Sequence, residues 1–215
     1  MMTGTELISF TREYLHESVQ DFWTPTKLLA TLNVAQKRMA LKMNKAASNV
    51  FVNSCTIPTI SGTQNYILPN GTAYSAAKKC TGKINSIYHA NELPMTKGDW
   101  RLFHQGGTGK PYQYVLMGNY LYLYPIPSAV YSLTLWYPYI PTTIVDSSAE
   151  IDFLEGFEPL IALEAARTSL VKDEADLSDI RMVFATFWED FKDTFCGNRD
   201  DEPDSMQEDV NDPDD

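Results

Sequence analysis

A long segment without any charged side chain, from Pro111 to Val145, constrains the fold more than any other feature of the sequence. On hydropathy alone, such a segment could be a membrane-spanning helix. Its five prolines argue against a helix, because each removes a backbone hydrogen bond that lipid cannot replace. Tyrosines and leucines also alternate in "NYLYLYP", from Asn119 to Pro125, with the period of two expected of a strand. We therefore predict uncharged β-sheet here and expect no membrane partner.

The predicted sheet extends over the middle of the chain. Alternating runs such as "NVFVNSCTIPTI" and "KINSIYHA" are separated by turn sequences such as "LPNGT". Gly118 and Asn119 stand between two alternating runs, which predicts a tight hairpin with the glycine at positive φ. The segment "GGTGKP", from Gly106 to Pro111, leads into the first of these two runs. It lacks the first glycine and the hydroxyl residue of a phosphate-binding loop, so we predict a flexible connection to a strand.

Both ends of the chain have helical periodicity instead. Thr3 and Glu6 are spaced for a capping box, and Thr24 with Pro25 marks the start of a second helix. That helix has an apolar stripe at helical spacing: Leu28, Leu32, Ala35, Met39 and Met43. Its five basic residues are predicted to be a solvated face rather than a nucleic-acid patch. After Asp152, two further stripes follow, one made of Leu160, Leu163, Ala166 and Leu170, and one made of Ile180, Phe184, Phe187, Trp188, Phe191 and Phe195.

This order of elements predicts an α+β fold. Residues 1–50 and 150–197 would form a discontinuous helical bundle, and residues 51–149 a small inserted antiparallel β domain. Residues 198–215 would be a disordered acidic tail, because residues 200–215 contain nine acids and no base. The net charge is -11 for the whole chain, so residues 1–199, with 17 bases and 19 acids, carry only -2. The tail could alternatively be a solubilising appendage without a partner.

No charged start followed by a short apolar run and a small-residue cleavage site opens the sequence, so we expect an intracellular product. The three cysteines are odd in number and far apart, which favours reduced thiols over a disulfide framework.

The sequence contains no signature of catalysis. The three histidines have no metal-ligand spacing, and no nucleophile motif surrounds a serine. Only an unknown fold could bring Cys55 and His89 together as a catalytic pair, and a buried thiol beside a strand histidine is the simpler interpretation. Paired acids are abundant at expected helix starts, where they favour the helix dipole. We therefore predict a protein that is not an enzyme and holds no metal or cofactor.

Tyrosine is concentrated in the uncharged segment, which contains eight of the twelve tyrosines. Aromatic platforms for single-stranded nucleic acid are accompanied by a positive groove, and this segment has no base. Two interpretations remain open, an internal sheet core and an interface with neighbouring subunits. The candidates for an inter-subunit or tail interface are Tyr120, Tyr122, Tyr124, Trp136 and Tyr139.

Three stretches together resemble the adaptor proteins of tailed-phage head-to-tail connectors. They are "FWTPTKLLATLNVAQKRMA", "GKPYQYVLMGNYLYLYPIPSAVYSLTLWYPYIP" and "FLEGFEPLIALEAARTSL", within roughly residues 20 to 170. The succession resembles the family's tryptophan-led helix, its G-x-P-x-x-Y strand with a following P-x-P turn, and its returning helix. The acidic tail lies outside the resemblance.

The resemblance implies a virion protein, made in the host cytoplasm, that forms a ring of twelve copies under the portal. That ring would carry the DNA channel on to the stopper or tail, with duplex DNA passing through without specific binding. We expect the portal to contact the last helix and the tail, at Phe187, Trp188, Phe191, Phe195, Asp200, Asp201 and Glu202. An ordinary core stripe is the alternative for Phe184 and Phe191. The alternative functions are a stopper or a tail-tube or tail-completion protein of the same connector and, less favoured, a phage-associated hydrolase.

Overall fold

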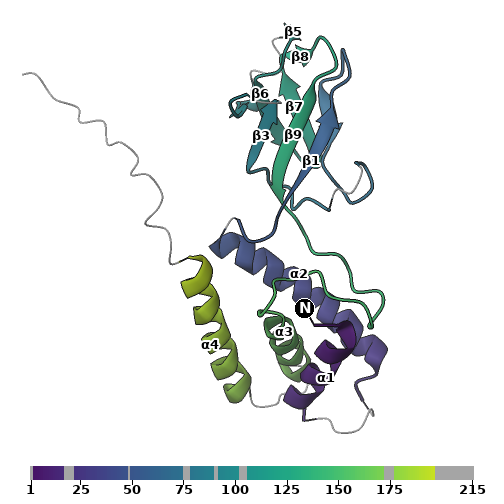
Figure 1. The fold of residues 1–215 in the computed structure, drawn as a ribbon, viewed down its shortest axis with the longest axis vertical. Helices are drawn as coiled ribbons and strands as arrows, with labels where there is room; N and C mark the ends of the chain where they lie inside the picture. Colours follow the sequence, from purple (N-terminus) through teal and green to yellow (C-terminus); the bar gives the residue numbers. More distant parts are fainter. Residues whose placement is uncertain are drawn as a thin grey trace, which may run out of the picture.

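The computed structural model describes residues 2–16, 22–47, 49–74, 78–89, 92–101, 106–171 and 177–196. Its helices and strands form two parts, one above the other in Figure 1. The helices are α1 (Gly4–Tyr14), α2 (Pro25–Ala46), α3 (Pro159–Leu170) and α4 (Ser178–Phe195). The strands are β1 (Val52–Pro58), β2 (Asn65–Ile67), β3 (Ser86–His89), β4 (Thr96–Lys97), β5 (Thr108–Gly109), β6 (Gln113–Met117), β7 (Tyr120–Tyr124), β8 (Ile126–Pro127) and β9 (Ser132–Pro138). We call these groups the helical part and the β part.

The helical part begins with the predicted capping signals. In α1, the Glu6 backbone N–H donates to Oγ1 of Thr3 at 3.3 Å, and the Thr3 backbone N–H donates to Oε2 of Glu6 at 2.7 Å. Thr24 caps α2, where Pro25 occupies the first turn. Both signals are local in sequence, which is why the sequence predicts these helix starts correctly.

α3 lies in the middle of the helical part and contacts the other three helices (Figure 1). The sequence predicts one apolar stripe, but the structure buries every residue from Leu160 to Ala166. This run includes Glu164, whose carboxylate accepts hydrogen bonds from Nε and Nη2 of Arg167 at 2.9 and 2.8 Å. Burial of that acid is tolerated because its charge is paired in a bidentate contact. The helix itself begins only at Pro159, so residues 139–158 connect it to the β part.

The β part contains two main sheets that enclose a common core. One has the strand order β1-β9-β3 and the other has the order β2-β7-β6-β4. Buried side chains from both sheets form one cluster, which includes Leu121 and Leu123 from β7 and Leu133, Leu135 and Tyr137 from β9. The predicted hairpin at Gly118 and Asn119 joins β6 to β7, with Gly118 at φ 59°.

The β part differs from the antiparallel prediction in two places. β4 pairs with β6 in parallel, and β5 pairs with β8 in parallel. Each of these pairs is only two residues long, so neither leaves an alternation that could be read from the sequence. The fold is mixed α+β, and the acidic tail lies outside the described residues.

Asp152 holds the two parts together near their boundary. Its Oδ1 accepts from Nζ of Lys78 at 2.7 Å and from the Tyr139 hydroxyl at 3.3 Å, and its Oδ2 accepts from the Thr142 backbone N–H at 3.0 Å. Burial alone would raise the pKa of Asp152, but the hydrogen bonds from Lys78 and Thr142 outweigh it and hold the pKa below its ordinary value. Gln36 of α2 donates to the backbone carbonyl of Asp152 at 3.2 Å, which ties the same residue to the helices.

Candidate interaction surfaces

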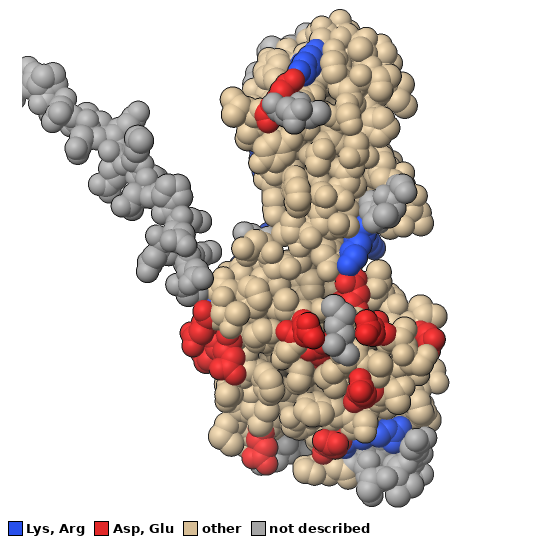
Figure 2. Space-filling model, in the orientation of Figure 1, with Lys and Arg blue, Asp and Glu red and all other residues tan. Residues whose placement is uncertain are grey.

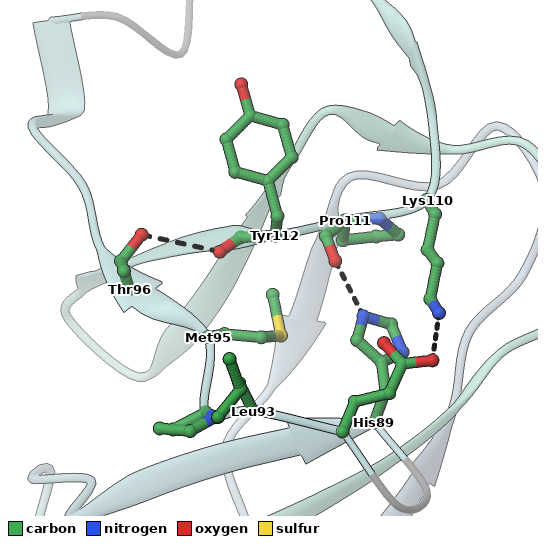
Figure 3. Close-up of a pocket in the computed structure, with 9 residues that line it drawn as sticks. His89, Leu93, Met95, Thr96, Lys110, Pro111 and Tyr112 are labelled. Atoms are coloured by element: carbon green, nitrogen blue, oxygen red, sulfur yellow. Dashed lines mark hydrogen bonds and ion pairs between the residues drawn. The ribbon is translucent and has the colours of Figure 1, made fainter.

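A cavity of about 600 Å³ opens on the β part, between the end of β3 and the start of β6 (Figure 3). Apolar side chains of Leu93, Met95 and Tyr112 line it, and Lys110 forms an ion pair with Glu92 at its edge. Nε2 of His89 lies 2.6 Å from the Pro111 carbonyl oxygen. A carbonyl only accepts, so this nitrogen carries the proton and donates.

The arrangement around His89 does not form a catalytic pair with Cys55. Cys55 lies on β1 and His89 on β3, with β9 between these two strands. Strands in a sheet are about 4.8 Å apart, so the two side chains are separated by roughly 10 Å. Burial also raises the pKa of the Cys55 thiol to about 11, which keeps it protonated at neutral pH.

The "GGTGKP" segment leads into a strand, as predicted. Gly106 and Gly107 adopt positive φ angles of 69° and 129°, and Thr108–Gly109 forms β5. β6 follows at Gln113, whereas a phosphate-binding loop would be followed by a helix. The Lys110 ammonium group is occupied by its ion pair with Glu92.

The aromatic residues of α4 lie mostly against the subunit's own helical core. Phe191 is fully buried and stacks between Trp188 and Phe195, with ring centroids 5.1 and 5.3 Å away. Phe187, Trp188 and Phe195 are partly buried against the same core. In this conformation Phe191 has no surface for a portal, whereas the exposed edges of the other three remain accessible. Asp200, Asp201 and Glu202 lie outside the described residues.

The predicted tyrosine surface is divided by the fold. Tyr120, Tyr122 and Tyr124 point to the outer face of the second sheet, while the leucines between them enter the core. Trp136 lies on the outer face of the other sheet, between Ser54 and Ser86. Tyr139 lies at the boundary with the helical part, where it packs edge-on against Phe51. The five candidates therefore do not form one surface.

Two residues that the sequence analysis did not single out extend the Tyr120 surface. Ile67 of β2 and Met117 of β6 stand directly opposite Tyr120 on its two sides. Directly opposite residues share a face of the sheet, so the three side chains form one row. Ile67, Met117 and Tyr120 are all exposed. We call them the apolar row; the register needed to find it depends on strand pairing, which the alternation alone does not give.

Within the described residues, His, Cys, Asp and Glu side chains form no group of three that could hold a metal ion. Of the helices that the structure describes, none is long and apolar enough to cross a membrane.

The chain as a whole matches a known protein family. No curated protein matches the chain in sequence. The family model described as SU10 adaptor protein matches residues 2–208, which is nearly the whole chain. The chain therefore belongs to the SU10 adaptor protein family and is a structural adaptor protein of a phage.

Proposed function

We propose that this chain forms an adaptor ring of twelve copies that joins the portal to the tail and extends the DNA channel of the virion. The observation that carries the proposal is the match of the SU10 adaptor family over residues 2–208. The exposed apolar row supports it, because large apolar side chains grouped on a surface mark protein contacts. The fold would then be a helical bundle, from residues 1–50 and 150–197, with the β domain of residues 51–149 inserted and an acidic tail from residue 198.

The proposed portal contact is the exposed side of α4 with the tail that follows it. The side chains of Phe187, Trp188 and Phe195 keep part of their surface in solvent. Aromatic residues are strong anchors at interfaces, and the acidic residues Asp200, Asp201 and Glu202 follow closely in sequence. The tyrosines of β7 with Trp136 and Tyr139 are the proposed contacts to neighbouring subunits or to a tail or stopper protein.

Duplex DNA is proposed to pass this protein without binding tightly. Acidic side chains gather on one face of the helical part (Figure 2). Such a face repels phosphates, whereas a basic lining would hold them through counterion release. The nine acids of residues 200–215 add further negative charge, while residues 1–199 carry only -2. Tight binding of duplex DNA by the wild-type protein at low salt would contradict this part of the proposal.

The direct test is the mass of the cognate portal ring before and after this protein is added, measured by native mass spectrometry. A mass increase of twelve copies is the expected result. If the bare portal binds nothing, the same measurement is repeated on connectors that already carry an adaptor. Binding there alone would replace the adaptor proposal with a stopper or tail-completion function.

A further inference from the structure

α2 has an unusual distribution of charge. Its 22 residues include five bases and no acid. Two of these bases and two apolar residues point away from the core at helical spacing, and we call them the outer face of α2: Val34, Lys37, Leu41 and Lys45. Arg38 beside them lies 3.7 Å from the carboxylate of Glu164 in the same subunit. Val34 and Leu41 are 49% and 48% exposed, so apolar surface lies in the middle of this basic face.

A second surface has the opposite charge. The segment from Val145 to Glu150, which we call the acidic loop, contains Asp146 and Glu150 and leads toward α3. Both acids are exposed, and Val145 is 85% exposed beside them. No Lys or Arg occurs between residues 111 and 166, so no base in this segment offsets the charge of the loop.

The two surfaces occupy different positions around α2 in one subunit. The chain just before the acidic loop is attached to the flank of α2, where the Ile144 backbone N–H donates to Oδ1 of Asn33 at 2.7 Å and Nδ2 of Asn33 donates back to the Ile144 carbonyl at 3.0 Å. Gln36 holds Asp152 on the same flank. Gln36 and Leu41 are five residues apart, which is roughly 140° around the helix. Leu41 therefore points away from the acidic loop of its own copy, whereas Lys37, one turn after Asn33, lies closer to that flank.

Charge then decides how two copies can meet. Two outer faces of α2 would bring bases against bases, and two acidic loops would bring acids against acids. Only contact of one surface with the other pairs opposite charges. If each copy gives its two surfaces to two different neighbours, the contact is heterologous, repeats from copy to copy and closes into a ring when the rotation allows.

We propose that the outer face of α2 of one copy binds the acidic loop of a second copy. This inference rests on the proposed ring function and names the contact between neighbours in it. Val34 and Leu41 with Val145 would exclude water at the centre, and Lys37 and Lys45 would face Asp146 and Glu150 around them. Within the described residues, neither Lys37 nor Lys45 forms an ion pair in the isolated subunit.

Duplex DNA is the competing occupant of a basic helix face. A DNA contact is made by bases that follow the phosphates, whereas here two apolar side chains separate the charges. Residues 1–199 also contain slightly more acids (19) than bases (17), so no overall positive charge reinforces this face. Both features favour a protein partner, and DNA becomes an outcome of the test.

The test is self-association of the full-length protein, measured by sedimentation at low and high salt. Three variants test the proposed contact: Lys37→Glu/Lys45→Glu, Asp146→Lys/Glu150→Lys, and all four changes together. Glu150→Lys alone keeps the turn in which Asp146 accepts from the Ser148 backbone N–H at 2.9 Å, so it tests the loop even if the double change disturbs folding. Lys83→Glu/Lys97→Glu is the matched control, because both lysines are exposed on the β part and the charge change is the same.

Reversal of either surface should weaken association about tenfold or more, because like charges then meet. The fourfold variant should return to within about threefold of wild type, since every contact again pairs opposite charges. The control should associate as wild type, and high salt should weaken the wild-type contact. Carbodiimide coupling of mixed ¹⁵N-labelled and unlabelled wild-type protein should join Lys37 or Lys45 of one copy to Asp146 or Glu150 of another.

Three results would overturn the contact: reversed variants that associate as wild type, a fourfold variant no better than the reversed ones, or a wild-type chain that stays monomeric and uncoupled at low salt. Duplex DNA binding that is lost in Lys37→Glu/Lys45→Glu, without self-association, would assign the face to DNA instead. The portal is absent from this experiment. If the copies associate in a charge-dependent way but do not bind the portal, only the adaptor proposal is refuted. If the protein binds the portal but its copies do not associate in this way, only the proposed contact is refuted.

Discussion

The ammonium group of Lys78 lies 2.7 Å from Oδ1 of Asp152, at the boundary between the strands and the helices. The two residues are far apart in sequence, and each belongs to a connecting segment rather than to a helix or strand. Lys78 also lies 4.1 Å from the centroid of the Tyr139 ring. The position of one part of the subunit relative to the other therefore depends on a small group of partly buried polar contacts.

Asp152→Asn should lower the free energy of unfolding by about 1–3 kcal/mol at pH 7, because it removes the charge that Lys78 and Thr142 stabilise. The Asp152 pKa is lowered in the folded state, so its stabilisation is present above the unfolded pKa of about 3.9 and is lost as the pH falls through the folded value. Urea unfolding at pH 7 and near pH 3 should show the difference between variant and wild type shrinking at the lower pH. A difference that stays constant across this range would exclude the charge as the cause.

Phe191→Ala should lower the free energy of unfolding by about 3–5 kcal/mol, because the ring is fully buried between α4 and the rest of the helical core. The matched control is Met182→Ala on the same helix, which is exposed and should change stability by at most about 0.5 kcal/mol. Denaturant unfolding measures both. Equal stability of the two variants would mean that α4 does not pack on the core in solution.

Gly4→Ala should destabilise the protein by about 1–3 kcal/mol, although alanine is the better helix former. A Cβ on Gly4 would lie 2.9 Å from Cα of Ser147, so either α1 or the acidic loop must move. Ser9→Ala, at an exposed position of the same helix, is the control for helix propensity. Thermal unfolding of both variants shows whether Gly4→Ala lowers or raises the stability of the protein. A more stable Gly4→Ala variant would show that the acidic loop moves away freely.

Met117→Gln/Tyr120→Ser should leave the free energy of unfolding within about 1 kcal/mol of wild type, because both side chains are exposed. If the apolar row is an interface, the same variant should reduce the number of copies that assemble on the portal or the binding of the next connector protein. Val130→Ser, an exposed apolar position on the same part of the subunit, should assemble normally. If the double variant assembles at the wild-type level, the apolar row is not an interface.

Removal of residues 197–215 should keep the fold and weaken portal binding. The last described helical side chains, up to Cys196, remain in place, and Sγ of Cys196 still reaches the Ala46 carbonyl at 3.7 Å. A cut after Lys172 would also remove Phe191 from the core, so weaker portal binding could then result from a loss of folding. Native mass spectrometry with the portal measures the effect. Undiminished binding of the shortened chain would assign the tail to solubility alone.

The sequence by itself determined the succession of helices, sheet and helices, because helical and strand periods are local properties of neighbouring residues. The Thr3 and Thr24 caps, the buried stripe of α2 and the Gly118 hairpin were all predicted correctly for this reason. The resemblance to phage adaptor proteins could also be found in the sequence, because it depends on the order of short stretches of residues along the chain.

Only the tertiary structure decided which of these residues are on the surface. Phe191 and Trp188 belong to one stripe of α4, yet one is fully buried and the other is partly exposed, because α4 meets α3 and α2 along only part of that stripe. The apolar row exists only because three strands pair in one particular register. The contact of Lys78 with Asp152 exists only because two connecting segments, far apart in sequence, lie side by side in the fold. Period and composition contain no information about contacts between residues so far apart, because those depend on how completed elements pack together.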